Sequence, residues 1–330
     1  MDDKTTAIEV AAIGSFFVGG KTVRLEGLPL RERRSAAGGP VYHDDPNGEI
    51  IAGQMYVQYV RLTRPSGIGP LLMWHGGGMT GASWETTPDG RPGWQTFFLR
   101  AGFHTYLSDA VERGRASWAP FPQVYPEAPF FRTARDAWED TFRLGPKGSW
   151  HADPAQRRAH PGTRFPVQAF EAFLAAGVPR WSCNDALTQA AYDALVAQLD
   201  PGVILLAHSQ AGNFGLTCAL NAPERVRAVI CLEPSGAPDP TRARAERVRE
   251  VPHLFVWGDN WRDNDFWRGS RPAAERWHDA LAQAGCDVTW IDLPARGIAG
   301  NSHVLMGDTN SDAIAGIVLE WLTARGLKRG

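Results

Sequence analysis

A serine just beyond a run of aliphatic residues is the first feature of this 330-residue sequence that could do chemistry. Residues 203–207 are all aliphatic, and residues 207–212 read Ala-His-Ser-Gln-Ala-Gly. Catalytic serines often stand in a G-x-S-x-G pattern on a sharp strand-to-helix turn, where small neighbours let the two backbones approach closely. Ala207 replaces the first glycine, so this is a variant of the pattern. We predict that Ser209 is a nucleophile and favour this over a serine that merely caps a helix.

A histidine near the C-terminus could activate this serine. A serine hydroxyl attacks well only when a nearby base accepts its proton. Of the nine histidines, His303 alone lies on a loop that follows the last predicted strand, from where it could reach back over the nucleophile. His75 and His208 are rivals by their position in the sequence. We expect His75 to support the glycine-rich loop that it begins, and the side chain of His208 to point away from the turn.

Two carboxylates could orient His303, and each follows a predicted strand. Such a group must fix the imidazole tautomer and stabilise the imidazolium. Asp259 has the commoner position, two strands after the nucleophile, but it lies in a polar run typical of a solvated loop. Glu233 directly follows the apolar run 228–232, where an idle charge would be costly. The residues by themselves leave both candidates open, with a slight preference for Asp259.

Residues 75–78 read His-Gly-Gly-Gly and could help to form an oxyanion hole. Such a site needs two backbone N–H groups aimed at the developing negative charge. One is expected from Gln210, the residue after the nucleophile, and the other from this loop. The loop has neither the G-K-[ST] ending of a P-loop nor the G-x-G-x-x-G spacing of a dinucleotide site, which argues against nucleotide binding.

The elements that must position these residues follow a strand, loop and helix pattern after residue 64. Apolar runs without alternation predict a mostly parallel sheet buried on both faces, with helices flanking it. Functional residues at the carboxyl ends of such strands lie where an open α/β sheet binds its ligands. The predicted strands are 70–74, 104–108, 203–207, 226–232, 253–257 and 288–293. The predicted helices are 93–101, 213–220 and 311–325.

Two regions depart from this pattern. Before residue 64, β-type runs at 7–18, 21–28 and 54–63 alternate with Gly-Gly and Pro-Asn-Gly, which predicts β-hairpins with turns at those positions. Residues 118–185 have no clear strand and many prolines and aromatic residues, and a structureless loop of that length would be unusual. We predict a largely helical cap inserted at 118–185, over an α/β core formed by 1–117 and 186–330. Most of its aromatic residues should pack on the core and a few should line a substrate pocket.

Composition narrows the possible functions. Hydrophobic residues make up 43% and charged residues 21%, with a net charge of -2, which is typical of a globular protein and not of a nucleic-acid binder. No run approaches the roughly 18 apolar residues of a membrane span. The N-terminal six residues, Met-Asp-Asp-Lys-Thr-Thr, do not resemble a secretory signal, so we expect a cytoplasmic location, or a periplasmic or secreted one if a signal has been removed.

The four cysteines favour a reducing compartment and argue against a zinc site. They are far apart and show no C-x-x-C spacing, and two of them lie in apolar stretches where buried thiols are common. These cysteines are Cys183, Cys218, Cys231 and Cys286.

Five segments together resemble bacterial α/β-hydrolase esterases whose triad acid is a glutamate after the sixth strand. The resemblance covers most of the chain from about residue 14. It implies Ser209 as nucleophile, His303 as base and Glu233 as acid, and so moves the preference from Asp259 to Glu233. It also implies Gly77 and Gln210 as oxyanion donors, a cap, and often a homodimer. The segments are 75–90, 109–117, 208–212, 232–234 and 300–310.

The predicted function is hydrolysis of an ester through an acyl intermediate on Ser209. The aromatic cap favours a small to medium, apolar or aromatic ester as partner, with no nucleic acid, membrane, metal or organic cofactor. Amide, peptide or lactone hydrolysis with the same residues is the first alternative. A non-catalytic ligand-binding protein on the same fold is the second, and the presence of candidates for all three triad positions argues against it.

Overall fold

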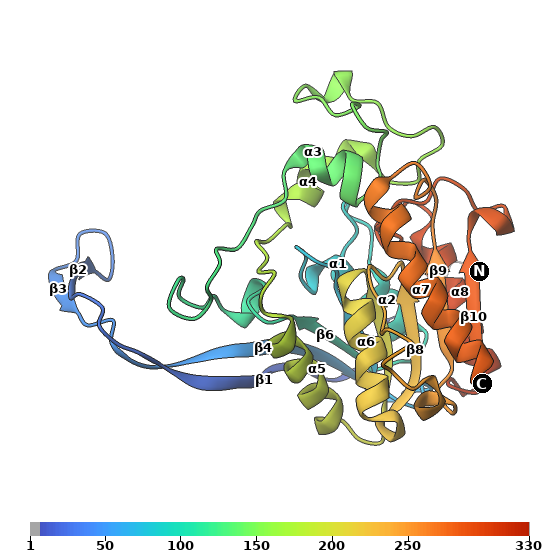
Figure 1. The fold of residues 1–330 in the computed structure, drawn as a ribbon, viewed down its shortest axis with the longest axis horizontal. Coiled ribbons are helices and arrows are strands. Elements are labelled where there is room, and N and C mark those ends of the chain that lie inside the picture. The colour runs from blue at the N-terminus through green and yellow to red at the C-terminus, as the bar shows by residue number, and fades with distance from the viewer. Residues whose placement is uncertain (1–6, 330) are drawn as a thin grey trace.

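The computed structural model describes residues 7–329, and in this part of the chain eight strands form one mixed sheet (Figure 1). The strand order is β1-β4-β6-β5-β7-β8-β9-β10. All pairs from β6 to β10 are parallel, whereas β4 is antiparallel to β1 and β6. The predicted strands after residue 64 are confirmed to within one residue at each end. The strands of the sheet are β1 (Val10–Leu25), β4 (Gly48–Leu62), β5 (Leu71–Trp74), β6 (Thr105–Asp109), β7 (Val203–His208), β8 (Val226–Leu232), β9 (His253–Trp257) and β10 (Val288–Asp292).

Helices cover both faces of the sheet because its central strands are apolar on both sides. In β7, Leu205 and Ala207 face α5, α6 and α7, whereas Ile204 and Leu206 face α2 and α8. The predicted helices correspond to α2, α6 and α8, while α5 and α7 lie outside the predictions. The helices of the α/β body are α1 (Ala82–Glu85), α2 (Trp94–Arg100), α5 (Asp185–Gln198), α6 (Gln210–Asn221), α7 (Asp265–Gln283) and α8 (Ser311–Ala324). Single 3-10 turns lie at Gly114–Ala116, Pro223–Arg225, Ala245–Val248 and Pro294–Arg296.

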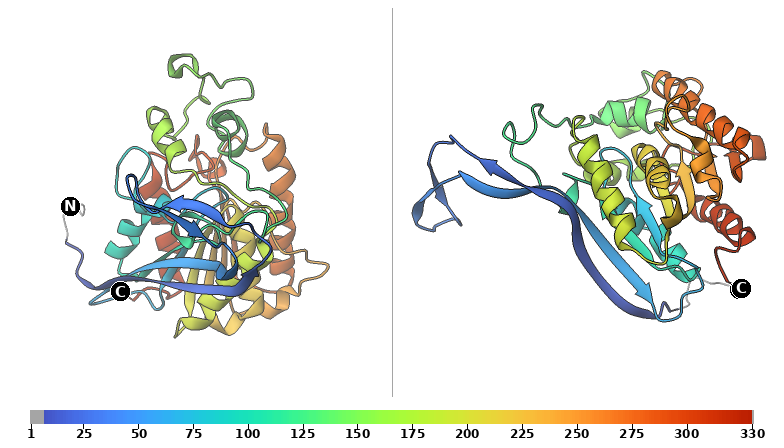
Figure 2. Two further views of the ribbon diagram at one scale, coloured as in Figure 1. Left: turned by 90° about the vertical axis from the view of Figure 1, so that its left-hand side faces the viewer. Right: turned by 60° about the horizontal axis from the view of Figure 1, so that its bottom comes forward.

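The first residues form a long two-stranded arm that projects from the body (Figures 1 and 2). A small sheet of β2 (Arg31–Arg34) and β3 (Val41–Asp44) lies at its tip. The predicted turn at Gly19-Gly20 is wrong, because β1 continues through it and Lys21 still pairs with Ala52. Both glycines have positive φ values, of 71° and 84°, which let the strand bend without losing its partner.

Residues 118–185 are called the inserted segment, and the part of it that contains α3 and α4 lies at the top of Figure 1. The segment contains helices, but they are short and irregular loops form its larger part. Its nine prolines explain this, since proline removes a helical hydrogen bond and clashes with the preceding turn. The helices are α3 (Ala134–Asp136), a π-helical turn (Ala137–Thr141), α4 (Phe170–Ala175) and 3-10 turns at Pro154–Gln156 and Val167–Ala169.

Candidate active site

Ser209 lies on the sharp turn between β7 and α6. Its φ of 57° and ψ of -117° are unusual for a residue with a side chain, and strain of this kind is often found at functional sites. The helix after the turn comes very close to the end of β8, since a Cβ placed on Gly212 would lie 2.5 Å from Cβ of Pro234. A small residue is therefore required here, as the variant pattern around Ser209 predicts.

The glycine-rich loop lies against this turn and needs its glycines for the close approach. A Cβ on Gly76 would lie 2.8 Å from Nδ1 of His208 and 3.0 Å from Cβ of Ser209, and one on Gly77 would lie 3.2 Å from Oε1 of Gln210. His75 holds the loop, because its Nδ1 donates to the Gly76 carbonyl (2.8 Å) and its Nε2 accepts from the backbone of Ala110 (3.0 Å). The predicted oxyanion donors Gly77 and Gln210 are thus neighbours beside Ser209.

His303 pairs with Glu233 and not with Asp259. The Nδ1 of His303 lies 2.5 Å from Oε2 of Glu233, and both side chains are fully buried. Glu233 follows β8, which is the sixth strand of the main sheet in chain order. The carboxylate of Asp259 instead accepts from the backbone N–H groups of Asn260 (2.8 Å) and Gly300 (3.1 Å), so it supports the loop that carries His303.

The loop that carries His303 is fixed from several sides. The backbone carbonyl of His303 accepts from Nε2 of His208 (2.8 Å). The ring centroid of Trp267 lies 4.0 Å from that of the His303 imidazole. Buried Asp308 accepts from the backbone (2.9 Å) and hydroxyl (2.7 Å) of Ser302. These contacts leave Nε2 of His303 buried and without a hydrogen-bond partner among the described residues, so its lone pair is available to a substrate or nucleophile.

The charges of the pair suit a general base. Burial alone would raise the pKa of Glu233, but Arg143 and His303 together hold that pKa at about 2. Burial lowers the pKa of His303 from its usual 6.5 to about 4. Glu233 acts to raise this pKa, and the positive charge of Arg143 acts to lower it. At neutral pH the carboxylate is therefore ionised while the imidazole is neutral. Since Nδ1 faces the carboxylate and carries the proton, Nε2 can accept one.

Arg143 is a residue of the site that the sequence analysis missed. It comes from the inserted segment, is fully buried, and has a positive φ of 54°. Its Nη2 donates to Oε1 of Glu233 (2.6 Å) and its Nε to the Asp259 carbonyl (2.9 Å). No local pattern marks this role, because the partners lie 90 and 116 residues away in the chain.

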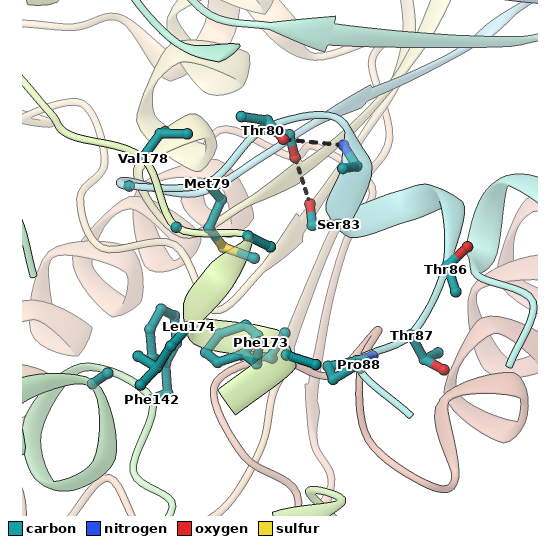
Figure 3. A pocket seen from close by; sticks show the side chains of 18 of the residues that line it. Met79, Thr80, Ser83, Thr86, Thr87, Pro88, Phe142, Phe173, Leu174 and Val178 are labelled. Atoms are coloured by element: carbon teal, nitrogen blue, oxygen red, sulfur yellow. Dashed lines mark hydrogen bonds between the residues drawn. The ribbon is translucent and has the colours of Figure 1, made fainter. Parts of the chain in front are cut away.

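A cavity of about 460 Å³ lies beside these residues, within the roughly 300–1,000 Å³ range of small-molecule sites. Its walls include Gly78 of the glycine-rich loop and Val304, the neighbour of His303. In Figure 3, apolar side chains from the inserted segment lie on one side, and three threonines and Ser83 lie on the other. The hydroxyl of Ser83 donates to the Thr80 carbonyl, and the Thr80 hydroxyl accepts from the backbone of Ala82. The lining aromatic residues are Phe131, Phe142 and Phe173.

Three further properties concern only residues 7–329. No group of three or more His, Cys, Asp or Glu side chains in this range could hold a metal ion. No helix in it is long and apolar enough to cross a membrane. The N-terminal residues 1–6, which we interpreted as unlike a secretory signal, lie outside the described residues.

The relationship to known proteins agrees with this geometry. The chain is similar to a solved structure of a novel bacterial esterase, with 31% identity over 98% of each chain and a TM-score of 0.81. The chain belongs to this family of α/β-hydrolase esterases. The predicted family and fold are thereby confirmed. The α/β-hydrolase is also 28% identical over 319 residues to a probable secreted lipase, phiG, of a fungal species (strain ATCC 74256), covering 81% of this chain and 85% of that protein. A scan of the chain against protein-family models found no match.

Proposed function

We propose that this α/β-hydrolase is a serine carboxylesterase that forms an acyl intermediate on Ser209. The observation that carries the proposal is the buried contact of 2.5 Å between Glu233 and His303, with Nε2 of His303 free. Ser209 is on the strained turn beside them, next to the glycine-rich loop. The names of the related proteins, an esterase and a lipase, favour an ester over an amide as substrate.

The proposed reaction has two steps. The hydroxyl of Ser209 attacks the ester carbonyl while Nε2 of His303 takes its proton, and the N–H groups of Gly77 and Gln210 bind the negative oxygen. Glu233 stabilises the imidazolium, which then gives its proton to the departing alcohol. In the second step His303 takes a proton from water, the hydroxide attacks the acyl carbon, and the acid leaves as the proton returns to Ser209.

The cavity supports an ester with an apolar or aromatic group of small to medium size. Phe173 and Leu174 of the inserted segment and Met79 beside the glycine-rich loop supply apolar wall, which favours alkyl or aryl groups. Amide and lactone hydrolysis remain alternatives, because the same residues perform acyl transfer on those substrates too.

A panel of p-nitrophenyl esters with short-chain and aromatic acyl groups tests the proposal. We expect Ser209→Ala to lose activity. Glu233→Gln should lower kcat by about 100-fold or more, because the imidazole loses the carboxylate that fixes its tautomer. Asp259→Asn is the comparison variant and should lower kcat much less than Glu233→Gln, since the Asp259 carboxylate accepts from two backbone N–H groups and does not contact the imidazole.

Other outcomes would point elsewhere. A crippling effect of Asp259→Asn with little effect of Glu233→Gln would contradict the assigned acid. A wild type that cleaves no ester but cleaves matched anilides or lactones would replace the ester proposal by one of its alternatives.

We also propose a reducing, cytoplasmic environment for the chain. All four cysteines are free thiols, and three of them are buried where they pack as small apolar side chains.

A further inference from the structure

The guanidinium of Arg180 lies against the glycine-rich loop. A Cβ placed on Gly77 would be 2.8 Å from Nη1 of Arg180 and 3.2 Å from Oε1 of Gln210, so the cation adjoins both predicted oxyanion donors. Main-chain bonds hold the arginine there. The N–H of Val178 donates to the Gly78 carbonyl (3.0 Å), and Arg180 exchanges two backbone hydrogen bonds with Phe130 (2.9 and 3.0 Å).

The charge of Arg180 has no counter-ion in contact with it. Among the described residues its side chain forms no ion pair and no hydrogen bond, and its Nε is buried without a partner. Its side-chain contact is the ring of Phe130, with the centroid 5.8 Å from the guanidinium carbon. Arg132, in the same segment, is different because it pairs with Asp136 at 2.5 Å.

A second arginine without a counter-ion lies close enough to Arg180 for the two charges to interact. Arg113 is only 3% exposed, and its Nε and Nη1 have no hydrogen-bond partner in the described part of the chain. Burial, together with the positive charge of Arg180, lowers the pKa of Arg113 to about 10. The carboxylate that attracts both cations is Asp185, which is exposed to solvent and accepts from the side chain of Gln210 (3.2 Å).

Two cations that share one exposed carboxylate leave an excess of positive charge at the loop. An unpaired buried charge is costly, and a bound anion would remove that cost. The planar guanidinium fork fits the two oxygens of a carboxylate. We propose that Arg180, with the charge of Arg113 nearby, binds a carboxylate of the substrate, so that the preferred esters carry this group close to the scissile carbonyl. The inference rests on the proposed esterase function.

The first test compares charged and neutral esters of similar size. On the acyl side the pair is mono-p-nitrophenyl glutarate and p-nitrophenyl butyrate. On the alcohol side it is 4-butyryloxybenzoate and its methyl ester. We expect the wild type to have the higher kcat/KM for the charged member of at least one pair, which identifies the side that carries the carboxylate.

Substitutions then assign the preference to Arg180. Arg180→Gln should lower kcat/KM for the charged ester by roughly 10- to 100-fold, the usual effect of losing a charge-assisted hydrogen bond. The neutral ester should stay within about threefold, and Arg180→Lys should restore part of the loss. Arg135→Gln, an exposed arginine in the same segment, is the control and should change neither ester. A wild type without preference, or an equal loss for both esters, overturns the proposal, and the equal loss would make Arg180 a support of the oxyanion loop.

A binding measurement separates this inference from the proposed function. In a Ser209→Ala background, monomethyl glutarate should bind more tightly than methyl butyrate by calorimetry, and adding Arg180→Gln should remove that difference. If the wild type cleaves no ester but this result holds, the esterase proposal fails and the carboxylate site stands. If esters are cleaved but the two ligands bind equally, the carboxylate site fails and the esterase proposal stands.

Discussion

Arg143 is buried together with the carboxylate that it neutralises, and its charge acts on two groups. It keeps Glu233 ionised, since removing the cation would leave burial as the main effect on that carboxyl. It also opposes protonation of His303, because a second positive charge close by is unfavourable. The same arginine therefore helps to hold the proposed acid anionic and the proposed base neutral, and we infer that it is a positioning residue of the site.

The pH dependence of Arg143→Gln tests this role. The base acts in its unprotonated form, so the acid limb of kcat/KM should lie below pH 6.5 in the wild type. Without the cation the pKa values of His303 and Glu233 both rise, so the limb should move to higher pH. Arg143→Lys retains the charge and should keep the limb near its original position.

A purely structural role would give a different result. Leaving one partner of a buried pair alone typically costs about 3–5 kcal/mol of stability, so folding of each variant should be checked by circular dichroism. A folded Arg143→Gln protein with a lower rate but an unmoved acid limb would contradict the electrostatic role.

The residues that the sequence could identify are those that stand at the ends of apolar strands. Ser209 and Glu233 are recognisable because each follows a buried run, and His303 because it follows the last strand. The choice between Glu233 and Asp259 could not be made from strand ends, because it depends on where the loop before His303 passes in space. Arg180 was not predicted from the sequence. Its distinguishing feature is that its side chain has no hydrogen bond or ion pair among the described residues, and no local sequence pattern shows this.

At the scale of elements, α6 packs very closely against the residues after β8. A Cβ on Gly212 would lie 2.5 Å from Cβ and 3.0 Å from Cα of Pro234. Any side chain at this position would therefore push α6, which begins after Ser209, away from the residue next to Glu233. Gly316 in α8 is the opposite case, because a Cβ placed on it would meet no neighbouring atom within 4 Å.

These two glycines form a matched pair for alanine substitution. Gly212→Ala should destabilise the protein by about 1–3 kcal/mol through overpacking and lower the esterase rate, because it displaces the turn at Ser209. Gly316→Ala should stabilise by about 0.5–1 kcal/mol, since alanine has the higher helix propensity and nothing obstructs it. Urea unfolding and ester hydrolysis of both variants provide the measurement. Equal effects of the two substitutions would show that the approach of α6 to Pro234 is not a constraint.

The strands were easier to predict than the helices. A strand with an unbroken aliphatic run, such as residues 203–207 of β7, is stable only when both of its faces are buried. The sequence therefore predicts such strands correctly. Helix α7 lay outside the predictions because Gly269 and Pro272 interrupt its helical pattern. Its start depends on Asn264, whose side chain accepts from the backbone of Trp267 (3.1 Å). In the inserted segment, proline positions and side-chain contacts determine where the short helices begin and end, and hydrophobic periodicity does not show these contacts.

At the scale of the whole molecule, one edge of the main sheet lacks a cover among residues 7–329. Its strand β1 presents apolar side chains to solvent there, with Ile13 at 68% and Phe17 at 58% exposure. Both residues pair with the part of β4 that also pairs with β6, so they lie on the main sheet. Exposed apolar surface together with an open strand edge is typical of an interface. We propose that a second copy of the chain covers this edge of the sheet, in agreement with the homodimer that the family resemblance implies.

Light scattering coupled to size-exclusion chromatography tests this homodimer. We expect the wild type to elute with twice the mass of one chain. The double variant Ile13→Asp and Phe17→Asp should elute as a single chain, because two buried carboxylates on each copy would oppose association. The double variant should still fold, since both side chains are exposed in the single chain. Phe266→Asp should leave the mass unchanged, because this exposed aromatic residue is on α7, which contacts β10 at the opposite edge of the sheet. A wild type with the mass of one chain would contradict the homodimer, whereas a double variant that stays dimeric would place the interface elsewhere.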